Sequence, residues 1–134
     1  MTLGLKSLIL DERDRLDEAM ALYKKQEAIR RELGDRSGLA TSFQTQAVTL
    51  AERGRPDEAM ALLEELEMIR RELDDHQGLA SCLISQAFID LSLGRPREGL
   101  PKVEVAYQVA SQHQLGALAQ RIRPVLDQLK QARP

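Results

Sequence analysis

Cysteine is scarce in this sequence: Cys82 is the only one among 134 residues. A single thiol cannot form a disulfide within the chain, and disulfide frameworks belong to oxidising compartments. We therefore expect a cytoplasmic protein whose fold is held together without covalent cross-links.

The chain also lacks an excess of either charge, with 19 basic and 21 acidic residues and a formal net charge of −2. Binding to nucleic acid relies on cations that neutralise phosphates, so this balance argues against a nucleic-acid ligand.

Long apolar runs are missing as well. The stretch at 8–10 is too short for a signal peptide, and the uncharged stretch 105–120 contains glutamines that a bilayer would reject. We expect no membrane interaction.

Residue groupings typical of catalysis or of cofactor binding are absent too. The glycines stand singly rather than in a phosphate-binding motif. Cys82 and the two histidines have no evident base and orienting acid around them, so we expect no enzyme activity. His76 follows Asp74 and Asp75, which are metal-ligand types, but the equivalent loop at 34–36 is Gly-Asp-Arg. The sequence predicts neither a metal nor a cofactor.

What the chain does contain is an internal repeat. Residues 16–55 and 56–95 align without a gap and are identical at 20 of 40 positions, including Asp-Glu-Ala-Met-Ala-Leu at 17–22 and 57–62. A fixed period of this length is typical of solenoids, in which each unit buries its apolar face against its neighbours. We expect one repeat domain over residues 1–134.

Each repeat has the pattern of a helical hairpin. Apolar residues recur at helical spacing, and polar glycine-containing loops lie at 34–38 and 74–78. Gly-Arg-Pro at 54–56 and 94–96, and Asp-Arg-Leu at 14–16, indicate hairpin connections near 14–17, 54–57 and 94–97. Residues 1–15 then form a half-repeat, and a capping helix at about 115–131 contains Pro124, which should kink or split it. Helices are predicted at about 2–13, 17–33, 38–53, 57–73, 78–93, 97–112 and 115–131.

The repeat resembles the tetratricopeptide repeat, in the 40-residue form common in bacteria. That family has a small residue, a glycine seven residues later and an alanine five residues after that. The matching residues are Ala47, Gly54 and Ala59, then Ala87, Gly94 and Gly99. The resemblance covers nearly the whole chain. It implies an all-α, right-handed superhelical array of about seven helices that acts as a protein–protein interaction scaffold.

The resemblance also implies a concave groove lined by the first helix of each hairpin, which suits a partner peptide or helix. Leu8, Val48 and Phe88 occupy equivalent positions and would form an apolar column. The alternative is that this column packs against the second helices or against another subunit. The implied partner-binding residues are Thr41, Gln44, Thr45, Val48, Glu52, Ser81, Ile84, Ser85, Phe88 and Leu91.

A different function also fits the sequence, namely self-association or a role as part of a larger bacterial regulatory protein. Leu3, Leu5, Leu8 and Ile9 give the N-terminal helix an apolar character that would suit a homo-oligomer.

Two polar features have alternative interpretations. Gln46 and Gln86 lie where the family usually has leucine, so each either bonds to a neighbouring helix end or contacts a ligand. The basic runs at 29–32 and 69–72 carry glutamates four residues before Arg31 and Arg71, and we expect a solvated outer face there.

Overall fold

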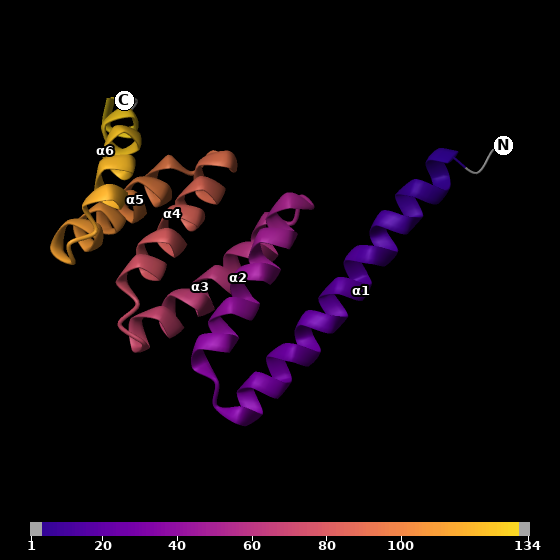
Figure 1. Cartoon of the computed structure of the whole chain (residues 1–134). Coiled ribbons are helices and arrows are strands. Elements are labelled where there is room, and N and C mark those ends of the chain that lie inside the picture. Colours follow the sequence, from indigo (N-terminus) through magenta and orange to yellow (C-terminus); the bar gives the residue numbers. More distant parts are fainter. Residues whose placement is uncertain (1–3, 132–134) are drawn as a thin grey trace. The chain divides into compact units, whose positions relative to one another are not determined.

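The structure, a computed structural model, describes residues 4–131, with side chains described from Arg15 onward. Over these residues the chain forms six helices and no strand (Figure 1), which confirms the predicted all-α helical-hairpin class. The helices are α1 Gly4–Leu33, α2 Arg36–Glu52, α3 Pro56–Glu72, α4 His76–Ser92, α5 Pro96–Gln112 and α6 Gly116–Gln131. The chain divides into two compact units, Met1–Ser42 and Phe43–Pro134, with α2 belonging partly to each.

Helix α1 runs unbroken for 30 residues, whereas the sequence predicts two helices joined near 14–17. The reason lies in the turn residues. Gly54 and Gly94 end their helices with φ angles of 74° and 73°, which favour glycine, and a proline then starts the next helix. The first copy has Asp14 and Leu16 at those places. Neither residue stops a helix, so α1 continues through them.

A carboxylate closes the loop after α1. Asp35 accepts hydrogen bonds from the backbone N–H of Gly38, at 2.9 Å, and from Nη1 of Arg30, at 2.7 Å. These bonds favour the charged carboxylate and lower the pKa of Asp35, the Gly38 bond most of all. The next repeat has the same arrangement, because Asp75 caps α4 through the N–H of Gly78 and pairs with Arg70. A capped helix start is therefore a repeated feature of the fold.

Within Phe43–Pro134, each helix from α3 to α6 packs against the next one. Small residues allow close packing: Ala80, Ala106 and Ala110 are fully buried in the core formed by α4, α5 and α6. Gly99 serves the same purpose, since a Cβ at that position would lie 3.2 Å from the carbonyl oxygen of Ala87. The 40-residue pattern of small residues thus marks helix contacts.

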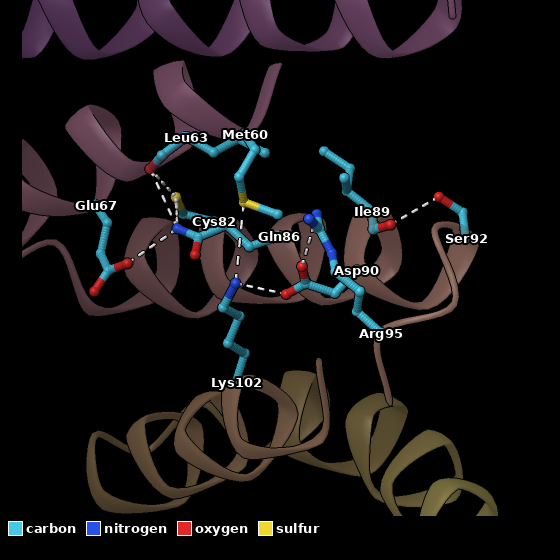
Figure 2. A network of polar contacts seen from close by, with 10 residues as sticks. All are labelled: Met60, Leu63, Glu67, Cys82, Gln86, Ile89, Asp90, Ser92, Arg95 and Lys102. Atoms are coloured by element: carbon cyan, nitrogen blue, oxygen red, sulfur yellow. Dashed lines mark hydrogen bonds and ion pairs between the residues drawn. The ribbon is translucent and has the colours of Figure 1, made fainter. Parts of the chain in front are cut away.

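Polar side chains also lie inside this unit (Figure 2). Nε2 of Gln86 donates to the carbonyl oxygen of Leu63, at 3.3 Å, and to Oε1 of Glu67, at 3.0 Å. Both partners belong to α3, so Gln86 bonds to the body of the neighbouring helix rather than to its end. Asp90, almost fully buried, pairs with Lys102 at 2.6 Å and with Arg95 at 3.1 Å.

A proline inside α6 and a stacked pair of histidines are further features of the unit Phe43–Pro134. Helix α6 contains Pro124 and is not split by it. The imidazole rings of His76 and His113 stack, with centroids 3.4 Å apart.

Among the described residues, no helix has both the length and the apolar character that crossing a membrane would require.

Candidate functional site: a groove between three helices

A cavity of about 270 Å³ lies within Phe43–Pro134 and has walls from α2, α3 and α4. The walls are mainly apolar, with polar side chains from each of the three helices. The lining residues are Gln44, Ala47, Val48, Ala51, Glu52, Leu63, Leu66, Arg70, Gly78, Ser81, Cys82, Ser85, Phe88 and Ile89.

Two apolar side chains, Val48 on α2 and Phe88 on α4, line the cavity and remain open to solvent. Val48 is 50% exposed and Phe88 is 54% exposed. They occupy the same position in consecutive repeats, 40 residues apart. Leu63 and Leu66 of α3 are at most 5% exposed and form a packed wall. Packing against α3 therefore leaves about half of the surface of Val48 and of Phe88 exposed.

The cavity wall contains two charged side chains, Arg70 and Glu52. Nη1 of Arg70 bonds to Oδ2 of Asp75 at 3.0 Å, and its Nη2 donates to Oε1 of Gln44. The Arg70 side chain is 14% exposed, and its Nε is buried without a hydrogen bond to any described residue. The expected solvated face therefore holds for Arg71, which pairs with Glu67 at 3.1 Å, but is wrong for Arg70.

Cys82, on α4, is a buried residue of the cavity wall. Its Sγ bonds to the carbonyl oxygen of Leu63 at 3.1 Å and accepts from Nε2 of Gln86 at 3.6 Å (Figure 2). Burial disfavours the thiolate and raises the pKa of Cys82 to about 11. A thiol in this state is a poor nucleophile. Ser81 and Ser85, on the same helix, add hydroxyl groups to the cavity wall.

Six of the ten predicted binding residues line the cavity. They are Gln44, Val48, Glu52, Ser81, Ser85 and Phe88. Ile84 instead packs, half-buried, against the core of α4, α5 and α6, and Leu91 is half-buried near Gly99 of α5. Thr45 is exposed, and its carbonyl oxygen accepts a hydrogen bond from Thr49. Thr41 belongs to the unit Met1–Ser42, where its hydroxyl donates to the carbonyl oxygen of Ser37.

The prediction from sequence missed the wall that α3 supplies, because the implied groove used only the first helix of each hairpin. Leu63, Leu66 and Arg70 come from the second helix. A signal for Arg70 was present, since an arginine stands five residues before the loop aspartate in both copies, as Arg30 with Asp35 and Arg70 with Asp75. Recurrence of that pair indicates an arginine held by an ion pair to the loop in both copies.

The described residues bring together no group of three or more histidine, cysteine or acidic side chains that could hold a metal ion. Comparison of the chain with protein-family models found no match, and neither did comparison with curated proteins. The candidate site is therefore defined by its geometry: a three-walled apolar cavity, half-exposed at Val48 and Phe88.

Proposed function

We propose that this chain is a protein–protein interaction module of the tetratricopeptide type, and that its groove between α2, α3 and α4 binds a peptide or a helix of a partner protein. The observation that carries the proposal is the pair Val48 and Phe88, which line one cavity and keep half of their apolar surface free. A side chain of a bound partner would enter the cavity and bury the exposed apolar side chains beside it.

The size of the cavity favours a side-chain anchor over a free small molecule. Its volume of about 270 Å³ is below the usual range of roughly 300–1,000 Å³ for small-molecule sites. The positive charge of Arg70 is paired with Asp75, so the other charged side chain in the lining, Glu52, is the one that faces a partner. We expect the bound segment to insert one large apolar side chain between Val48 and Phe88, with polar contacts to Ser81, Ser85 and Glu52 around it.

Comparison of the two repeats supports a role in selecting a partner. The small buried residue is the same in both repeats at Ala47 and Ala87, whereas the exposed residue beside it differs, Val48 in one and Phe88 in the next. Sequence differences concentrated at open positions are expected where specificity is set. We also propose that the protein acts in the cytoplasm, because its single cysteine, Cys82, forms no disulfide within the chain. Its role there would be binding and not catalysis.

A peptide-display selection on the purified chain tests the proposal. Peptides enriched on the wild type should share a large apolar residue. Phe88→Glu should weaken their binding at least about tenfold, as expected for loss of an anchor contact. Met68→Glu is the matched control, because Met68 is also apolar, is 65% exposed and does not line the cavity.

Circular dichroism of both variants checks that the helices are kept. Equal binding by Phe88→Glu and wild type would contradict the assignment of the site. Failure of the wild type to enrich any peptide, across both helical and extended libraries, would contradict the proposed function itself.

A further inference from the structure

The groove between α2, α3 and α4 has a different charge at each end. Gln44 and Glu52 both line its cavity, and their separation on α2 corresponds to about 12 Å along the helix axis. Arg70 donates to Gln44 and is paired with Asp75, so the end near Gln44 carries a cation that already has an acidic partner. The end near Glu52 carries an exposed carboxylate.

No cation within the described part of Phe43–Pro134 forms an ion pair with Glu52. The two arginines that follow it, Arg53 and Arg55, do not line the cavity, and Arg55 pairs with Glu58 at 3.6 Å. A carboxylate beside an apolar cavity attracts a cation and repels an anion. The groove therefore favours a partner with positive charge at this end.

An acidic residue at the end of α2 does not stabilise the helix itself. Glu52 is the last residue of α2, and the negative end of the helix dipole disfavours a carboxylate there. Helix α3 also ends in a glutamate, Glu72, but Arg70 and Arg71 lie in its last turn, whereas the last turn of α2 has no basic residue. A cation supplied by a partner would balance the charge at the end of α2.

The next repeat has a neutral residue, Ser92, at the position equivalent to Glu52. The hydroxyl of Ser92 donates to the carbonyl oxygen of Ile89, at 2.8 Å, near the end of α4. The end of this helix therefore forms without an acid. Glu52 differs from its counterpart at a position that lines the groove, where differences between repeats set the choice of partner.

We propose that the segment bound in the groove carries a lysine or an arginine beside its apolar anchor, and that this cation pairs with Glu52. The proposal rests on the proposed function, since it gives the chemistry of the partner at the same site. The apolar side chain enters the cavity between Val48 and Phe88, and the cation lies at the end of the groove. An acidic segment would meet the carboxylate of Glu52 and be rejected.

The spacing of the two partner residues follows from α2. Val48 and Glu52 lie on the same face of the helix and about 6 Å apart along its axis. An extended segment covers this distance in about two residues, at roughly 3.3 Å each. A helical segment covers it in about four residues, at roughly 1.5 Å each. Both spacings keep the anchor and the cation on one side of the bound segment.

Selection of random displayed peptides on the full chain and on two charge-reversed variants tests this. Peptides enriched on the wild type should carry Lys or Arg about two or about four residues from their large apolar residue. Glu52→Lys should reverse this preference and enrich Asp or Glu at the same spacing. Glu64→Lys is the matched control and should keep the preference of the wild type, because Glu64 is an exposed acid that does not line the cavity.

One enriched peptide, synthesised with a fluorescent label, gives the size of the effect. Glu52→Gln should weaken its binding about threefold, as expected for an exposed ion pair, and should remove most of the salt dependence of binding. Both variants of Glu52 remove an acid from the negative end of a helix, so circular dichroism should show the helices unchanged.

Enriched peptides that share an apolar residue but show no excess of cations would overturn this inference and leave the proposed function standing. A preference for cations that survives Glu52→Lys, or that Glu64→Lys also reverses, would overturn the assignment to Glu52. Enrichment of no peptide at all would overturn the proposed function and this inference with it.

Discussion

At the scale of single residues, Cys82 shows how packing sets chemical behaviour. Its thiol is 3% exposed and its pKa is raised to about 11, from 9.0 for an unperturbed thiol. At pH 8 the thiolate population should be about 100-fold lower than in an unfolded chain. We therefore predict that alkylation by iodoacetamide proceeds about 100-fold more slowly in the native protein than in urea.

The same shift predicts a pH dependence of stability. Because the folded-state pKa of Cys82 is higher than the unfolded one, its contribution is fully present below pH 9.0 and is lost as the pH rises toward 11. The difference in unfolding free energy between wild type and Cys82→Ala should narrow over that interval. Equal alkylation rates in buffer and in urea would contradict this account of the thiol. So would a difference in unfolding free energy between wild type and Cys82→Ala that stays constant as the pH rises from 9.0 toward 11.

The family resemblance implied a shared surface for Val48 and Phe88, which stand at one repeat position, but it did not predict the buried arginine. In the structure both apolar side chains line one cavity. Arg70 lies beside Arg71 in a basic run, and both have the same local pattern. Their environments differ because Asp75 and Gln44 lie on other elements, and contacts between elements are not encoded in the spacing of one helix.

At the scale of elements, the contact between α4 and α5 contains a buried ion pair that the preceding repeat lacks. Asp90 is 3% exposed at its side chain and pairs with Lys102, which is 27% exposed. Forty residues earlier the equivalent positions are Leu50 and Leu62. The two repeats therefore have different residue types at these equivalent positions, an ion pair in one and two leucines in the other.

This difference predicts a thermodynamic cycle. Asp90→Leu alone should destabilise the protein by about 3 kcal/mol, the lower end for buried pairs, because Lys102 keeps some access to water. Asp90→Leu with Lys102→Leu recreates the pair of the earlier repeat and should regain part of that loss, while Arg95, which also pairs with Asp90, stays without this partner in both variants. Chemical denaturation of the wild type and the three variants measures the coupling. If the double variant lost as much unfolding free energy as the two single variants together, the pair Asp90 and Lys102 would not be interchangeable with two leucines.

Element boundaries were predictable where the chain contains residues that stop a helix. Glycine and proline at 54–56 and 94–96 mark two connections, which lie between Glu52 and Pro56 and between Ser92 and Pro96, and both glycines take positive φ angles. At 14–17 the same period predicted a turn that is not there. Periodicity gives the position of a connection, but the turn itself requires residues able to adopt it, and Asp14 and Leu16 favour continued helix.

At the scale of the whole molecule, burial is distributed unevenly among the helices. Helix α4 has nine buried residues, whereas α6 has two within the described part of the chain. Helix α4 is packed by α3 and α5, and α6 packs against α5. In repeat proteins stability is approximately a sum over units and their contacts, so helices with fewer neighbours open more readily.

Amide hydrogen exchange should follow this distribution. We predict the slowest exchange in α4, which has nine buried residues and a neighbouring helix on each side, and faster exchange in α6, which has two. Uniform exchange across the helices would contradict the link between burial and opening.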